Sequence, residues 1–168
     1  MWLTILLVVV VGIGFVALTG APYVPSKRRD VERAFSELYL LTSKDVLVDI
    51  GSGDGKVLRI ASGYGAKAFG YEIHPVLVAI AKWLSRNDSN VSVHLANFWT
   101  ATLPKNTTVV YTFGDTRDIV KMYKKVESTA TANRTTIAFI SYAFKVGDLK
   151  PNKTVGAHHL YTVSPLQK

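Results

Sequence analysis

The chain has 168 residues, which is room for one domain with little added to it, and 48% of them are hydrophobic, which is ample for a core. It contains no cysteine, and this excludes disulfides and thiolate metal sites. The formal net charge of +8 at pH 7 favours an anionic partner surface, either phospholipid headgroups or nucleic acid, although an ordinary solvated basic surface fits equally well.

The first predicted element is an apolar run from Trp2 to Leu18, interrupted only by Thr4 and two glycines. At 1.5 Å per residue this run reaches about 25 Å, enough for a minimally tilted membrane span. The basic triplet Lys27-Arg28-Arg29 follows it, and the positive-inside rule then places the C-terminal part in the cytoplasm. We therefore expect a single-pass transmembrane anchor over residues 1–20 and one catalytic or binding domain over residues 21–168. A cleaved signal peptide is the alternative.

Five N-x-Ser/Thr sequons oppose the cytoplasmic placement, because they would suit a glycosylated exterior domain. They begin at Asn87, Asn90, Asn106, Asn133 and Asn152. The chain is rich in serine and threonine, so such triplets also arise by chance, and we keep the cytoplasmic prediction.

A helix is predicted after the stiff proline-rich stretch Pro22–Pro25, because apolar side chains recur there at helical spacing and form one stripe. These side chains are Val31, Ala34, Phe35, Leu38 and Leu41. We expect this stripe to pack on a sheet.

The centre of the chain has the order strand, glycine-rich turn, helix, strand and acid. The predicted strands are Val46–Val48 and Ala66–Tyr71, the helix is Lys56–Tyr64, and Glu72 is the acid. The turn between the first strand and the helix consists of Asp49, Ile50, Gly51, Ser52, Gly53, Asp54 and Gly55. This order is that of a mononucleotide-binding half, in an α/β fold.

The turn predicts the kind of cofactor. Three alternate glycines let backbone N–H groups approach a ligand closely, and Glu72 can accept hydrogen bonds from both ribose hydroxyls. The spacing is not the G-x-G-x-x-G of dinucleotide sites, and the Asp49 carboxylate suits an ammonium group better than a pyrophosphate. The candidate cofactor contacts are therefore Asp49, Gly51, Ser52, Gly53, Asp54, Gly55 and Glu72.

The adenine side of the site is predicted after Glu72. Ile73 is placed to press an apolar side chain on an adenine face, and His74 is interpreted as a surface residue near the cofactor or as a base. A helix is expected over Val76–Ser85 and a third strand over Val91–Leu95. Asn97 and Phe98 close that strand and are further cofactor candidates.

The fourth strand is predicted over Thr107–Phe113, and its end reaches the sheet edge where open α/β folds bind substrate. Asp115 is therefore the candidate catalytic, substrate-site acid, or equally an N-terminal acid of the helix Arg117–Thr129. The remaining predictions are a strand over Thr135–Ser141, a long loop over Tyr142–Val155 and a last strand over His159–Val163.

The pattern Asp49-x-Gly51-x-Gly53-x-Gly55 with Glu72 resembles motif I and the following acidic motif of class I S-adenosylmethionine-dependent methyltransferases. This resemblance implies S-adenosyl-L-methionine as cofactor and a Rossmann-like, mostly parallel sheet with helices on both faces. In that superfamily an acid usually accepts from the adenine amino group at the position of Asn97, where an amide oxygen can still accept.

A closer resemblance is to the small membrane-anchored lysine methyltransferases of the ATP synthase c subunit and the adenine nucleotide translocase, with their prokaryotic relatives. It rests on Pro22–Pro25, Asp49–Gly55, Tyr71–Pro75, Asn97–Trp99 and Phe139–Pro151, in one order at compact spacing. It implies a membrane-associated protein substrate with a lysine acceptor, and a proline-rich segment that folds over the pocket and brings Tyr23 and Val24 near it. Asn97, Asp115 and Leu149 depart from the usual residues of that family.

Methyl transfer to lysine requires no metal and no covalent intermediate, only alignment of the nucleophile and loss of its proton. An apolar pocket would favour that loss, and Tyr111, Phe113, Tyr142 and Phe144 are predicted to line it. Alternatives are methylation of a small molecule or RNA, and a non-catalytic membrane-tethered protein that binds S-adenosylmethionine. RNA ranks lower, because no separate RNA-binding module is evident.

Overall fold

The fold is known from a computed structural model that describes Trp2, residues 26–114 and residues 116–166. Its helical elements are α2 (Arg28–Arg33), the π-helical segment η1 (Ala34–Leu38), α3 (Lys56–Gly63), α4 (Pro75–Leu84) and α5 (Ile119–Asn133). Its strands are β1 (Val46–Ile50), β2 (Lys67–Glu72), β3 (Val91–Leu95), β4 (Val109–Thr112), β5 (Ile137–Tyr142), β6 (Lys153–Val155) and β7 (His158–Val163).

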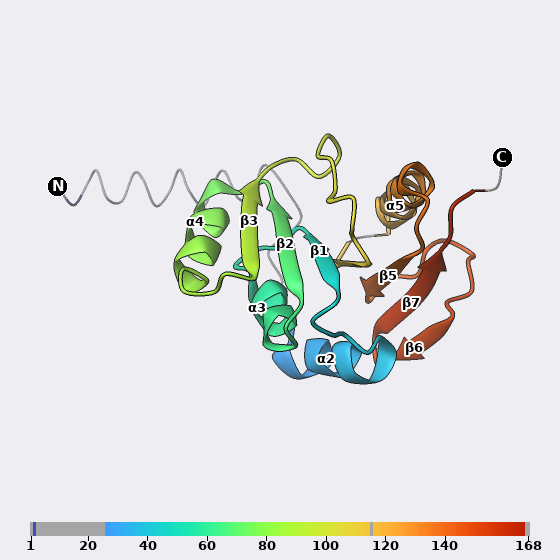
Figure 1. Cartoon of the computed structure of the whole chain (residues 1–168), viewed down its shortest axis with the longest axis horizontal. Coiled ribbons are helices and arrows are strands. Elements are labelled where there is room, and N and C mark those ends of the chain that lie inside the picture. Colours follow the sequence, from blue (N-terminus) through green and yellow to red (C-terminus); the bar gives the residue numbers. More distant parts are fainter. Residues whose placement is uncertain (1, 3–25, 115, 167–168) are drawn as a thin grey trace.

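The strands form one seven-stranded sheet in the order β3-β2-β1-β4-β5-β7-β6 (Figure 1). The first five strands of this order pair in parallel, and β7 pairs antiparallel with both β5 and β6. The predicted Rossmann-like, mostly parallel sheet is therefore confirmed. All five residues of β1 are buried, as expected of a central strand covered on both faces.

Helices cover both faces of the sheet, also as predicted (Figure 1). On one face, α2, η1, α3 and α4 enclose a core that includes Phe35, Leu47 and Leu58. On the other face, α5 and the segment between β3 and β4 enclose a second core that includes Val48, Phe98 and Ile119. Alternation along β1 supplies both cores, because Leu47 and Val48 point to opposite faces.

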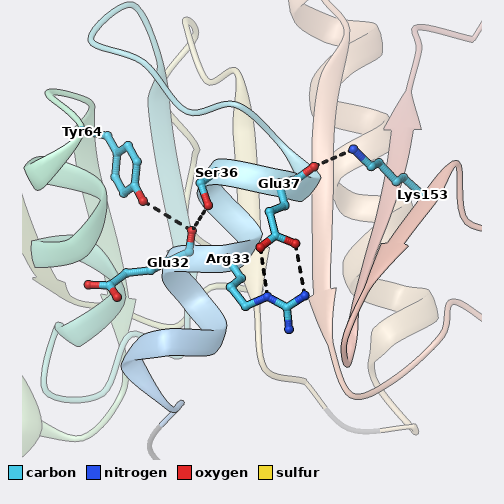
Figure 2. A network of polar contacts seen from close by, with 6 residues as sticks. All are labelled: Glu32, Arg33, Ser36, Glu37, Tyr64 and Lys153. Atoms are coloured by element: carbon cyan, nitrogen blue, oxygen red, sulfur yellow. Dashed lines mark hydrogen bonds and ion pairs between the residues drawn. The ribbon is translucent and has the colours of Figure 1, made fainter.

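The predicted apolar stripe of the first helix is confirmed, since all five of its side chains are buried. The helix itself is shorter than the stripe suggests: α2 passes at Ala34 into the π-turn of η1, which ends at Leu38. In Figure 2 this segment joins two parts of the fold. Tyr64 of α3 donates to the Glu32 carbonyl (3.4 Å), and Lys153 of β6 donates to the Glu37 carbonyl.

Two sequence predictions need correction or lie outside the described residues. The loop predicted over Tyr142–Val155 contains strand β6, which is only three residues long and lacks an apolar pattern. The predicted membrane span lies, apart from Trp2, outside the described residues. Among the helices that the structure describes, none is long and apolar enough to cross a bilayer.

Candidate functional site

The glycine-rich turn leaves β1 at the carboxyl edge of the sheet and reverses into α3. Gly51, Gly53 and Gly55 have φ values of 71°, 54° and 74°, in the left-handed region that residues other than glycine rarely adopt. Gly51 and Ser52 donate their N–H groups to the Tyr71 carbonyl at 2.9 and 3.3 Å. The turn is thus tied to the end of β2, which brings it beside Glu72.

Glu72 holds this turn in place. Its Oε2 accepts the N–H of Gly53 at 2.9 Å, and its Oε1 accepts the N–H groups of Ile73 (2.8 Å) and His74 (2.9 Å). The side chain is buried. A carboxylate has about four acceptor positions, so three backbone donors leave it capacity for a further hydroxyl. The predicted ribose contact is therefore compatible with the structural role of this residue.

Asp49 is the second acid of the site and is also buried. Burial, with the negative charges of Glu72 and Asp54 adding to it, raises the pKa of Asp49 well above its usual range. Among the described residues no hydrogen bond is made by its carboxylate. Three carboxylates around one glycine turn form a site that favours a cation and disfavours a phosphate.

The turn is packed too closely to admit extra atoms on its protein side. A Cβ on Gly70 of β2 would lie 2.5 Å from Ser52 Oγ and 2.6 Å from Leu58 Cδ1. The Ser52 hydroxyl is buried there and has no hydrogen-bond partner in the part of the chain that the structure describes. Asp54 is held at the start of α3, where its Oδ1 accepts the Lys56 N–H (3.1 Å) and its Oδ2 lies 3.6 Å from Arg59 Nη2.

The predicted adenine contacts follow the carboxyl ends of two neighbouring strands: Ile73 comes after β2, and Asn97 and Phe98 come after β3. The Ile73 side chain is 52% exposed, so it is available to a flat apolar ligand. Asn97 is exposed, and its Oδ1 already accepts the Trp99 N–H at 2.9 Å. Phe98 is buried, and its side chain packs in the second core. His74, interpreted from the sequence as a surface residue near the cofactor or as a base, is buried, and its N–H donates to Glu72 Oε1.

Three of the four predicted acceptor-pocket aromatics gather at the carboxyl ends of β4 and β5. The ring of Phe113 lies edge-on to Tyr142 (4.7 Å between centroids) and stacks with Phe144 (6.4 Å), and all three side chains are half-buried. Tyr111 was predicted with them, and this was wrong. It is buried in the first core, 6.0 Å from the Phe35 ring.

The position of Tyr111 shows a polar pair that sequence reasoning missed. Its hydroxyl lies 3.0 Å from His158 Nε2, and the His158 ring lies 4.6 Å from that of Tyr142. Burial lowers the pKa of His158 to about 4, and the opposing charge of Asp30 offsets only part of this, so the imidazole is neutral at pH 7. Tyr142 in turn donates to Asp30 Oδ2 at 3.4 Å. The pairing of β5 with both β4 and β7 brings Tyr111, Tyr142 and His158 together, and no local pattern indicates it.

Three predicted site residues, Tyr23, Val24 and Asp115, lie outside the described residues. Their predicted roles stay predictions. Within the described ranges no group of three or more His, Asp or Glu side chains is arranged to hold a metal ion.

Curated relatives of this chain are named as protein lysine N-methyltransferases. Over 109 residues the chain is 32% identical to the ATP synthase c-subunit lysine N-methyltransferase of Rattus norvegicus, covering 63% of this chain and 49% of the relative. Over 86 residues it is 36% identical to the adenine nucleotide translocase lysine N-methyltransferase of Mus musculus, covering 49% and 37%. The chain thus spans half or less of the length of these curated relatives.

A solved structure matches more of the chain. The RNA methyltransferase of Salinibacter ruber, solved in complex with S-adenosyl-L-homocysteine, superposes with a TM-score of 0.76 at 26% identity. The match covers 86% of this chain and 96% of that one. The family described as the ANTKMT methyltransferase domain matches residues 49–153, which include the glycine turn, Glu72 and the aromatic cluster. Because this match extends over more than half of the sequence, the chain belongs to the ANTKMT methyltransferase domain family.

Proposed function

We propose that the protein is an S-adenosyl-L-methionine-dependent methyltransferase that modifies a lysine of a membrane-associated protein. The observation that carries the cofactor is the set of buried acids, Asp49 and Glu72, around the glycine turn. S-Adenosylmethionine carries a sulfonium and an ammonium group, and the Salinibacter ruber relative binds its demethylated product. The curated relatives, both named lysine N-methyltransferases, support the acceptor.

Each residue of the site has a distinct task in this proposal. Asp49 orients the cofactor's ammonium group, directly or through water, and its pKa falls when that cation arrives. Glu72 fixes the ribose while it holds Gly53. Ile73 supports the adenine, and Asn97 and Phe98 border it. The bound cofactor supplies a methyl group on sulfonium, which is transferred by in-line displacement.

The acceptor lysine would enter over Phe113, Tyr142 and Phe144. Aromatic faces attract an ammonium group and accommodate the methylene chain of lysine. Their partial burial disfavours the charged form, which helps the amine to lose the proton that blocks attack. We propose Asp115, which follows β4 in the sequence, as the catalytic, substrate-site acid, and Tyr23 and Val24 as a cover over the cofactor. We also propose that residues 1–20 anchor the domain, residues 21–168, on the cytoplasmic side of a membrane.

Methylation of RNA is the second candidate. It is favoured by the likeness to the Salinibacter ruber RNA methyltransferase and by the net charge of +8. It ranks below lysine because the curated relatives that share the family are named as lysine methyltransferases.

The test is to incubate the purified full chain with methyl-labelled S-adenosylmethionine and with membranes or total RNA. Label in a small hydrophobic protein supports the proposal, and identification of methyl-lysine after hydrolysis completes it. Label in RNA supports the second candidate. Cofactor binding without any transfer indicates a non-catalytic binding protein. The Glu72→Ala variant serves as the control for transfer by a contaminating enzyme.

A further inference from the structure

Helix α4 carries large apolar side chains on the face that points away from the protein. Val78 and Ala81 are buried against the sheet. Val76, Ile80 and Trp83 are 61%, 41% and 63% exposed, and their i, i+4, i+7 spacing places them on one face. Leu84 extends this face and is 40% exposed. A surface helix of a protein in water is ordinarily polar there, so this face is suited to a partner surface.

Basic groups border this apolar stripe, which consists of Val76, Ile80, Trp83 and Leu84. Lys82 and Arg86 are exposed beside it, and the helix contains no acidic residue. The guanidinium carbon of Arg86 lies 5.0 Å from the Trp83 ring, and its Nη1 donates to the Trp83 carbonyl at 2.9 Å. The stripe therefore has two cationic groups at one edge, and one of them, Arg86, is held against Trp83.

A shallow hollow of about 430 Å³ lies between the end of α4 and the edge strand β3, lined in part by Lys82, Ser85 and Arg86. The Ser85 hydroxyl is buried and has no hydrogen-bond partner among the described residues. Asp88 also lines the hollow, but its Oδ1 accepts from Ser62 Oγ (2.8 Å) and from the Asn90 N–H (3.1 Å). The two cationic side chains at this hollow, Lys82 and Arg86, suit a small anion such as a lipid phosphate.

We propose that α4 lies on the surface of an anionic bilayer. The stripe enters the boundary between headgroups and acyl chains, and Lys82 and Arg86 contact lipid phosphates. A tryptophan such as Trp83, placed between apolar and basic side chains, is typical of helices that lie in the membrane interface. The net charge of +8 adds long-range attraction to such a surface. The apolar run Trp2–Leu18 of the same chain is independently suited to a bilayer.

This orientation would serve the proposed function, although the docking does not depend on it. Helix α4 starts at Pro75, three residues after Glu72, so Val76 lies near the carboxyl edge of the sheet. Placing α4 on the bilayer brings that edge close to the headgroups. A lysine of a membrane protein at that depth could then reach the aromatic cluster at the same edge.

The experiment uses the fluorescence of Trp83 in the full chain. The chain has three tryptophans, so Trp2→Phe with Trp99→Phe leaves Trp83 as the only one. This variant is reconstituted in vesicles of phosphatidylcholine and phosphatidylglycerol, with or without bromine atoms on the upper acyl chain. We expect brominated lipid to quench most of the Trp83 emission and aqueous iodide to quench little of it.

A matched control retains Trp99, by replacing Trp2 and Trp83 with Phe. Trp99 lies beside α5, where Lys125 Nζ donates to its carbonyl at 2.8 Å, and we expect iodide and not bromine to quench it. Adding Val76→Ser and Ile80→Ser to the Trp83 variant should make the Trp83 emission accessible to quenching by iodide. Both side chains are exposed, so an unchanged Tm would exclude misfolding.

The other occupants of the stripe give different results. Emission quenched by iodide and unaffected by bromine would overturn the proposal, since the stripe would then face water. Shielding from both quenchers would overturn it too, because protein would then cover the stripe, either residues 2–18 of this chain or a second copy. Equal quenching in vesicles of phosphatidylcholine alone would overturn the role given to Lys82 and Arg86. No outcome depends on methyl transfer.

Discussion

Two aspartates at opposite ends of β1 have opposite environments. At the amino end, Asp45 accepts hydrogen bonds from Tyr39 Oη (2.8 Å), from the Thr42 N–H (2.8 Å) and hydroxyl (2.9 Å), and from Thr108 Oγ1 (2.8 Å). Burial alone would raise the pKa of Asp45, but these hydrogen bonds outweigh it and the pKa is lowered. At the carboxyl end, burial and neighbouring acids raise the pKa of Asp49.

The difference separates a structural acid just before β1 from a candidate functional acid near the end of β1. Asp45 is satisfied by the fold and stabilises it, joining the loop after η1 to the start of β4. Asp49 costs folding free energy in the ligand-free protein, because a buried charge lacks compensating donors among the described residues. A residue that is unfavourable for the fold and lies beside a glycine turn is expected to gain its partner from a ligand.

The largest expected effect is at the carboxyl ends of the parallel strands, where Glu72 lies at the end of β2. Glu72→Ala removes the predicted ribose contact and the acceptor of three backbone N–H groups. We expect the dissociation constant for S-adenosylmethionine to rise tenfold or more, since hydrogen bonds to a charged group contribute about 1.5–3 kcal/mol each. Calorimetric titration measures this, with Glu72→Gln as a control that keeps an acceptor oxygen. An unchanged affinity would reject the assignment of Glu72.

At the amino end, Asp45→Asn should reduce stability and leave cofactor affinity unchanged. The amide keeps one acceptor but places donors against the Tyr39, Thr42 and Thr108 groups, at a cost of about 2 kcal/mol. Chemical denaturation at pH 7 measures the change in unfolding free energy. A weakened cofactor affinity at full folding would contradict the separation of the two ends.

Asp49→Asn should have the opposite signature. The pKa of Asp49 is higher in the folded protein than in the unfolded chain. Its contribution to the free energy of unfolding is therefore fully present below the unfolded carboxyl pKa of about 3.9, and is lost as pH rises through the pKa of the folded protein. Removing the charge should therefore raise Tm at neutral pH, flatten the fall of stability with increasing pH, and weaken cofactor binding. Melting curves from pH 4 to pH 8 test this, and a lower Tm throughout would contradict it.

The smallest effect is expected at the surface of the amino end. Arg33 and Glu37 form a bidentate ion pair at 3.1 Å, drawn in Figure 2, but both side chains remain in contact with solvent. Water screens such a pair and its two long side chains lose conformational freedom. Glu37→Gln should leave Tm nearly unchanged. A large drop would mean that this network, rather than the Asp45 cluster, holds the amino end together.

The sequence predicted the glycine turn more completely than the elements around it. The order of Asp49, three alternate glycines and Glu72 is local, and the backbone requirements of a tight turn fix which residues can stand there. The apolar stripe from Val31 to Leu41 could be predicted for a similar reason, since helical spacing gathers its side chains on one face. These features depend on residues close together in the chain.

Other features depended on pairing between distant segments. Strand β6 is too short and polar to carry a pattern, and it exists because β7 offers an edge to pair with. Tyr111 looked like a pocket residue at a strand end, yet the packing of Phe35 from η1 and His158 from β7 encloses it. Long-range contacts of this kind leave no trace in local spacing.

What the sequence by itself determined is the glycine turn with its two acids, because covalent spacing and backbone conformation are properties of the chain alone. Only the tertiary structure decided that Glu72 has hydrogen-bond donors while Asp49 has none among the described residues, and which face of α4 is exposed. That helix is apolar almost all round, so its periodicity cannot indicate the buried side. Packing against β2 and β3 selects Val78 and Ala81 for the core and leaves Val76, Ile80 and Trp83 exposed.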